Sequence, residues 1–188
     1  MTRQPHDRFA KNYLEELLSP LGTVEISKEV ADATRQIDIF FSPNPNLGEI
    51  SDELGILGRI ASSSALLEPY RNPPTRSETR DCILKLFTVF AGTRRQARRE
   101  NTTWNEEDLP RLWILAPSTT VALLESFGAR LEVERWCEGI YFFPVAYRTA
   151  IVAIDRLPVL PETLWLRLLG RGATQIQAVR ELQPFSFR

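Results

Sequence analysis

The sequence predicts an α/β fold, a single-domain mixed sheet flanked by helices, and three observations support this class. Helical and extended patterns follow one another in the order α-β-β-β-α-β-α before further mixed elements. The chain has 188 residues, close to the usual size of one domain, and 43% hydrophobic with 25% charged residues is ordinary for a globular protein. It shows no internal repeat and no low-complexity tract. We therefore expect one domain over residues 1–188.

The first predicted elements are a helix and three strands. Phe9, Tyr13 and Leu17 recur every four residues and predict a helix over residues 7–18, which the following Ser-Pro pair ends. Short apolar or alternating segments bounded by turn residues predict the strands that follow. They lie at residues 23–30, 35–41 and 65–70, with a loop at 42–48 and a helical turn at 54–60 between the last two.

A second long helix is predicted over residues 77–92, because Ile83, Leu86 and Phe87 belong to an apolar stripe. Residues 94–108 are basic and then acidic, which predicts a loop or a frayed helical extension. The remaining segments alternate between strand and helix patterns. They are strands at 111–116, 131–135, 140–143 and 149–154, and helices at 119–127, 161–169 and 173–182.

The histidine and cysteine content excludes several kinds of site. His6 is the only histidine, so a Cys/His zinc site or a two-histidine helix motif cannot be assembled. A serine or cysteine hydrolase would need His6, near the N-terminus, as its base. Cys82 and Cys137 match no paired or metal-ligand spacing. Any metal would therefore be held by carboxylates, which favours Mg²⁺ or Mn²⁺.

The sequence also bears on the compartment. Two distant cysteines, with no signal peptide recognised before them, indicate a reducing, intracellular setting. No apolar run approaches the length of a membrane span. We therefore expect a cytoplasmic protein with no membrane partner.

Basic residues are concentrated in one part of the chain. The whole chain has 23 basic and 24 acidic residues, a net charge of −1, whereas residues 71–99 hold 8 basic and 2 acidic residues, an excess of 8 − 2 = +6. Arg94, Arg95, Arg98 and Arg99 lie in one run. Such a run suits a nucleic-acid phosphate backbone, and it is equally compatible with a solvated loop.

Three acidic positions stand out as candidate metal ligands. Asp38 lies within a strand among isoleucines and phenylalanines, where a charge is unfavourable unless it is paired or bound to a metal. Arg35 or Arg80 could provide such a pair. Glu68 ends an apolar strand, and Glu16 falls near the margin of the buried face of the first helix.

This layout, with an acid on a first helix, an aspartate on a strand after a hairpin and a glutamate on the next strand, resembles the core of the PD-(D/E)XK nuclease superfamily. The wider sequence is similar to one bacterial branch of it, the proteins described as recombination-promoting nuclease or transposase-like. The similar segments cover most of the chain. They are HDRFAK at 6–11, RQIDIF at 35–40, LEPYRN at 67–72, RDCILK at 80–85, LWILAP at 112–117 and LWLRLLG at 164–170.

The resemblance implies a restriction-endonuclease-like fold and a metal-dependent DNA endonuclease. Asp38 and Glu68 would hold Mg²⁺ or Mn²⁺, with Glu16 as a third or outer ligand. DNA is the implied partner, and a homodimer is compatible with it because many nucleases of this kind cut two strands as pairs. The arginines expected along the DNA backbone are Arg71, Arg76, Arg94, Arg95, Arg98 and Arg99.

The chain departs from the family pattern at one position. The pattern has a lysine, sometimes a glutamine, two residues after the glutamate, but here that residue is Tyr70, which cannot supply positive charge. Helical geometry predicts that Lys85 faces water, because it points away from the stripe of Ile83 and Phe87. It favours Arg80 as the substitute cation, so Arg80 or Tyr70 would be the stabilising catalytic group. The alternative is a degenerate nuclease fold that serves as a nucleic-acid- or protein-binding module.

Overall fold

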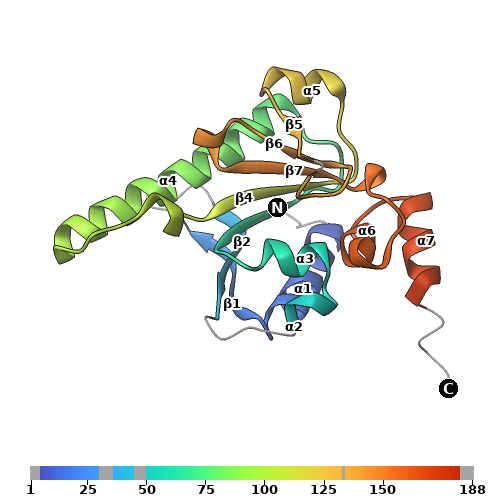
Figure 1. The fold of residues 1–188 in the computed structure, drawn as a ribbon, viewed down its shortest axis with the longest axis horizontal. Coiled ribbons are helices and arrows are strands. Elements are labelled where there is room, and N and C mark those ends of the chain that lie inside the picture. The colour runs from blue at the N-terminus through green and yellow to red at the C-terminus, as the bar shows by residue number, and fades with distance from the viewer. Residues whose placement is uncertain (1–4, 30–35, 45–49, 133, 183–188) are drawn as a thin grey trace.

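A seven-stranded mixed sheet runs through the centre of the protein (Figure 1). The computed structural model describes residues 5–29, 36–44, 50–132 and 134–182. The strand order is β1-β2-β3-β4-β7-β6-β5, in which β4 is parallel to β3 and β7 and the other neighbouring pairs are antiparallel. The strands are β1 (Gly22–Glu29), β2 (Gln36–Pro43), β3 (Ala65–Pro69), β4 (Arg111–Ala116), β5 (Arg130–Leu131), β6 (Ile140–Phe142) and β7 (Thr149–Ala153).

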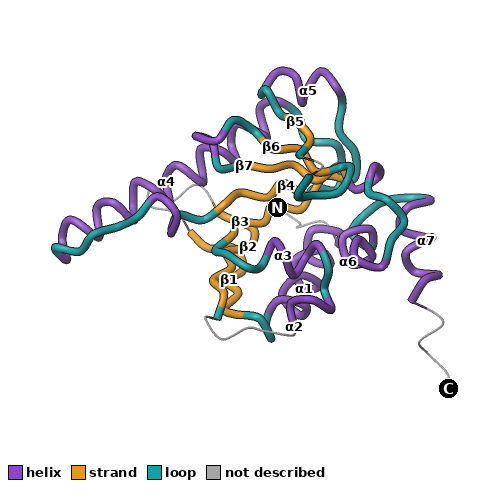
Figure 2. The backbone as a smooth tube through the Cα atoms, viewed as in Figure 1, coloured by secondary structure: helices purple, strands orange, loops and turns teal. Residues whose placement is uncertain are grey.

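Helices cover both faces of this sheet (Figure 2), which confirms the predicted α/β class. Side chains of α1, α3 and α6 enter the hydrophobic core on one face, and those of α4 and α5 enter the core on the other. No described helix is long and apolar enough to cross a membrane. The helices are α1 (Pro5–Leu18), α2 (Ile50–Glu53), α3 (Ile56–Ile60), α4 (Arg76–Glu100), α5 (Val121–Ser126), α6 (Leu164–Arg167) and α7 (Ala173–Leu182).

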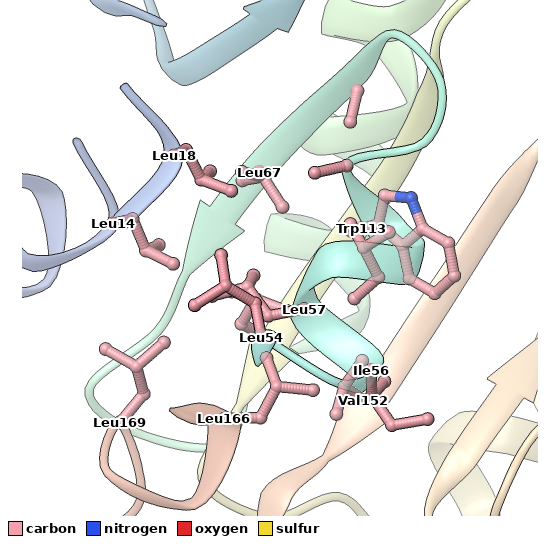
Figure 3. Packing of buried hydrophobic residues seen from close by; sticks show 14 of the residues in the cluster. Leu14, Leu18, Leu54, Ile56, Leu57, Leu67, Trp113, Val152, Leu166 and Leu169 are labelled. Carbon is pink, nitrogen blue, oxygen red and sulfur yellow. The ribbon is translucent and has the colours of Figure 1, made fainter. Parts of the chain in front are cut away.

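The first core attaches α1 to the sheet (Figure 3). Leu14 of α1, Leu57 of α3 and Leu166 of α6 are fully buried over a sheet face that presents Leu67 and Trp113. Burying one leucine stabilises a fold by about 1.5–3 kcal/mol, so this layer contributes strongly to the position of the helix. As a result α1 lies against β1, β2 and β3.

The second core attaches α4 to the opposite face of the sheet. Cys82 and Leu86 are buried with Leu66 of β3. A capping box starts the helix: Glu78 N–H donates to Thr75 Oγ1 at 3.2 Å, and Thr75 N–H donates to Glu78 Oε2 at 2.7 Å. Because only five residues separate this cap from the end of β3, the first turns of α4 lie beside that strand end.

The long helix continues past residue 92, in line with the helical extension that was one of the two predictions for residues 94–108. The helix α4 continues to Glu100, so the arginine run lies on a helix that projects beyond the sheet (Figure 1). Asn101 has φ 51° and ends the helix in the left-handed conformation, and Thr102 N–H donates to Ala97 O at 2.9 Å. Ala97 is buried between exposed neighbours, and the hydrogen bond from Thr102 N–H to its carbonyl closes the last turn of this polar helical segment.

Two smaller differences concern the segment after β4. The strand predicted at residues 131–135 is reduced to β5, which pairs only through Arg130 and Leu131. The helix predicted from residue 119 begins at Val121, because Thr120 is its N-cap and its side chain accepts a hydrogen bond from Leu123 N–H at 3.1 Å.

Candidate functional site

Asp38 and Glu68 meet where β2 and β3 separate. The β2–β3 pairing ends at Ile39 and Leu67, one residue short of these two acids. The backbone N–H of Asp38 donates to Oε1 of the Glu68 side chain at 3.2 Å and not to a backbone carbonyl of β3. The glutamate carboxylate therefore takes the next position of the strand ladder and is held beside Asp38.

Glu68 is a buried carboxylate paired with a lysine from the neighbouring helix. Glu68 is only 2% exposed, and Nζ of Lys85 on α4 donates to Glu68 Oε2 at 2.7 Å. Burial and the nearby Asp38 charge raise the pKa of Glu68 to about 7, although Lys85 opposes the shift. Burial would lower the pKa of Lys85, but attraction to Glu68 outweighs it and the pKa is raised. Lys85 is therefore a cation held at this site.

A second lysine serves Asp38. Lys11 of α1 is 7% exposed, and its Nζ lies 2.5 Å from Asp38 Oδ1 and 3.5 Å from Asp7 Oδ2. The contact between Lys11 and Asp7 joins consecutive turns of α1, whereas the contact with Asp38 joins the helix to the sheet. The first helix thus brings one cation and one acid to the strand end.

Tyr70 and Cys82 form the uncharged side of the site. Tyr70 Oη and Cys82 Sγ lie 3.2 Å apart, and Cys82 Sγ lies 3.9 Å from Glu68 Oε2. Burial raises the pKa of Tyr70 far above its ordinary value and raises the pKa of Cys82 to about 12. Both groups are therefore neutral at physiological pH, and the cysteine is not an activated nucleophile.

A cavity of about 330 Å³ opens onto this cluster. Arg171 Nη1 supports its edge by donating to Arg71 O at 3.1 Å and to Asn72 Oδ1 at 2.6 Å. Three acids, a lysine and a tyrosine therefore line one opening. The lining residues are Asp7, Asp38, Glu68, Pro69, Tyr70, Arg71 and Lys85.

The structure brings together some of the predicted site residues and leaves others apart. Asp38, Glu68, Tyr70 and Arg71 all line the cavity. Glu16 is exposed on a later turn of α1 and does not line it, so it is not placed to be a third metal ligand. The first-helix acid at the cavity is Asp7, because the N-terminal part of α1 meets the start of β2.

The structure places a different cation at the cavity from the predicted substitute, Arg80. Arg80 is exposed and does not line the cavity, whereas Lys85, predicted to face water, pairs with Glu68. The reason is that Phe87 is 38% exposed, so the buried stripe of α4 is shifted toward Cys82. Lys85 follows Cys82 by three residues and flanks this stripe. The sequence contains only three lysines, and two of them, Lys11 and Lys85, pair with the acids of this site. The scarcity of lysine was therefore a signal in the sequence that could have pointed to these two residues.

The alternative partners suggested for Asp38 were Arg35 and Arg80. Arg35 lies outside the described residues, and the ion pair that the structure shows for Asp38 is with Lys11.

The predicted DNA-contacting arginines lie on α4 or before it. Arg76 is exposed at the start of α4, and the run from Arg94 is exposed on its projecting part. Arg95 and Arg99 line a surface hollow of about 440 Å³ there.

The donor set is suited to a hard divalent cation. Asp38 and Glu68 offer carboxylate oxygens, the ligands that Mg²⁺ and Mn²⁺ prefer. Among the described residues no group of three or more histidine, cysteine, aspartate or glutamate side chains is placed to hold a metal. Mg²⁺ commonly uses one or two carboxylates and keeps several waters. Asp38 and Glu68 provide two carboxylates of the kind that such an ion uses, and an added cation would stabilise the charged form of Glu68, whose pKa burial raises.

No family model, curated protein or solved structure matches the chain. The relationship to the PD-(D/E)XK superfamily stays a prediction from the residues.

Proposed function

We propose that the protein is a metal-dependent DNA endonuclease of PD-(D/E)XK type that hydrolyses phosphodiester bonds. The observation that carries the proposal is the ion pair of Lys85 with Glu68, 2.7 Å apart, at the separating ends of β2 and β3. The pair places a lysine beside the glutamate. In the family pattern that lysine comes from the strand, at the position that Tyr70 occupies here. The first helix, the hairpin strands β1 and β2 and then β3 follow in the order of the resemblance, with the short helices α2 and α3 between β2 and β3.

Each residue has a role in this proposal. Mg²⁺ or Mn²⁺ held by Asp38 and Glu68 would activate water and neutralise charge on the phosphate. Lys11 orients the Asp38 carboxylate, and the Asp38 amide orients that of Glu68. Lys85 places a positive charge at the cavity, where it would stabilise the developing negative charge on the phosphate. Tyr70 contributes packing and a hydrogen bond with Cys82.

The arginines of α4 suit the DNA backbone in this proposal. Arg94, Arg95, Arg98 and Arg99 are exposed on the projecting half of the helix, and Arg71 lines the cavity. Exposed guanidinium groups along a helix contact phosphates without reading sequence. One active site cuts one strand at a time, so simultaneous cleavage of both strands would need two copies of the chain.

The second candidate is a degenerate nuclease fold retained as a nucleic-acid- or protein-binding module. The pairing of charges favours it: Asp38 has Lys11 and Glu68 has Lys85, so each carboxylate is already compensated without a metal. A buried pair of this kind is stable in place, because removing either partner leaves an uncompensated charge.

Nicking of supercoiled plasmid in Mg²⁺ or Mn²⁺ distinguishes these candidates. We expect the wild-type protein to nick, and Asp38→Asn and Lys85→Met to lose on the order of a hundredfold or more in rate, as loss of one electrostatic stabiliser does elsewhere. Lys28→Met is the matched control, because Lys28 forms an exposed pair with Glu25. Equal nicking by wild type and Asp38→Asn would indicate a contaminating nuclease, and no nicking in any metal would favour the binding module.

A further inference from the structure

A second cavity, of about 450 Å³, lies at the other end of β3. Ala65, the first residue of β3, is the strand partner of Arg111, which lines this second cavity. Glu68, near the end of β3, lines the first cavity described above. The two cavities share no lining residue. The cationic and aromatic lining, called the arginine–tryptophan pocket below, is formed by Arg59, Arg111, Arg135, Arg148, Trp113 and Trp136.

The pocket carries a net positive charge among the residues that the structure describes. Its lining contains four arginines and one carboxylate, Glu132, a balance of 4 − 1 = +3. None of the ion pairs found among the described residues includes any of these arginines. Burial and the charge of Arg148 lower the pKa of Arg111, so the guanidinium groups destabilise each other. An anion in the pocket would relieve this repulsion.

Two buried donors in the lining have no partner. Trp113 is 2% exposed, and its Nε1 makes no hydrogen bond to any described residue. Arg148 Nε is likewise buried and unpaired, although Arg148 Nη2 donates to Leu109 O at 2.5 Å. A buried donor without a partner costs about 1–3 kcal/mol. The lining therefore favours a ligand with acceptor oxygens.

Aromatic faces accompany these charges. Trp136 and Phe142 are half-buried in the lining, with Arg59 over the Trp136 ring at 4.4 Å and Arg111 over the Phe142 ring at 5.3 Å. Planar guanidinium groups bind phosphate through paired hydrogen bonds and stack on flat rings. A cavity of this volume is within the range of small-molecule sites. A phosphate joined to a flat ring matches both features.

We propose that the arginine–tryptophan pocket binds a nucleoside 5′-phosphate, either a free nucleotide or the phosphorylated end of a DNA strand. Arg111 and Arg148 contact the phosphate, and the base lies against the guanidinium of Arg59, which covers the Trp136 ring. The site is separate from the proposed catalytic cavity and does not depend on nuclease activity.

Calorimetric titration with deoxyadenosine 5′-phosphate tests the proposal. We expect saturable binding at one site, with deoxyadenosine and inorganic phosphate each at least tenfold weaker, because each lacks half of the contacts. A short single-stranded DNA with and without a 5′-phosphate distinguishes the two sources. A strand-end site prefers the phosphorylated DNA at least tenfold, whereas a nucleotide site binds the free nucleotide more tightly than either DNA.

Variants locate the binding. Arg59 and Arg135 are exposed, so Arg59→Gln with Arg135→Gln should fold normally and weaken binding about tenfold or more. Arg130→Gln with Arg180→Gln removes the same charge outside the pocket and should leave affinity unchanged. Asp38→Asn should also bind normally, which separates this result from the nuclease proposal. Equal weakening by the control pair, equal affinity for phosphate and nucleotide, or no saturable binding would overturn the inference.

Discussion

Lys85 on α4 and Glu68 on β3 form an ion pair 2.7 Å long across seventeen positions of sequence. The pair connects the first turns of the long helix to the point where β2 leaves β3. Because Glu68 is buried, this contact affects stability as well as any chemistry at the site. It also places an ammonium group where the strand provides only the neutral Tyr70.

The raised pKa of Glu68 makes stability depend on pH. A carboxyl that binds its proton more tightly when folded contributes most at low pH, so its contribution falls as pH rises from its ordinary value of 4.5 to about 7. Glu68→Gln lacks this titration. Urea unfolding is measured from pH 4.5 to 7.5. The free energy of unfolding of the variant should rise relative to that of the wild type as pH rises, by up to about 3 kcal/mol.

Glu181 provides a control of opposite sign for that experiment. Its hydrogen bonds with Arg167 lower the pKa of this carboxyl, so its contribution is present above the ordinary pKa and is lost in acid. Relative to the wild type, Glu181→Gln should therefore lose stability as pH rises toward 4.5 from more acidic solution, so this control is measured below the pH range used for Glu68. Parallel curves for Glu68→Gln and wild type would contradict the raised pKa of Glu68.

Metal binding should stabilise the protein through Asp38. At a Mg²⁺ or Mn²⁺ concentration ten times the dissociation constant, binding adds about 1.4 kcal/mol, a rise in melting temperature of roughly 3–6 °C for a chain of this size. Asp38→Asn should abolish the rise in a thermal melt. Glu16→Gln should retain it, because Glu16 is exposed away from the cavity. An unchanged metal response in Asp38→Asn would remove Asp38 from the site.

Tyr70 should have little direct role in catalysis, since its hydroxyl is engaged with Cys82. Tyr70→Phe should keep plasmid-nicking activity within about threefold and reduce stability by about 1 kcal/mol, the net value of one hydrogen bond. Tyr70→Lys should not raise activity, because Lys85 already supplies the charge and a second buried ammonium would repel it. A large gain in Tyr70→Lys would show instead that Lys85 does not serve the reaction.

The exposed arginines of α4 should determine how DNA binding responds to salt. Arg95→Ala with Arg99→Ala removes two guanidinium groups from the projecting helix, and the slope of log affinity against log salt should flatten by up to about 1.8. Arg130→Ala with Arg180→Ala removes the same charge elsewhere and should change the slope less. Equal slopes for the wild type and the Arg95/Arg99 variant would identify the run as a solvated surface.

Local pattern determined much of this protein. The periodicity of α1, the alternation in β2 and the apolar run of β3 were sufficient to predict an α/β sheet flanked by helices and to place Asp38 and Glu68 on neighbouring strands. These predictions succeed because side-chain direction within one element follows from its geometry and because strands that follow one another in sequence usually lie side by side in a sheet.

The tertiary structure decided which charged groups reach those acids. Whether Lys85 faces water depends on how α4 is rotated about its axis, and that rotation is set by the packing of Cys82 and Leu86 on the sheet. The choice of Asp7 and Lys11 over Glu16 depends in the same way on which end of α1 crosses β2. Rotation and crossing point are fixed by contacts between distant segments, which periodicity within one segment does not contain.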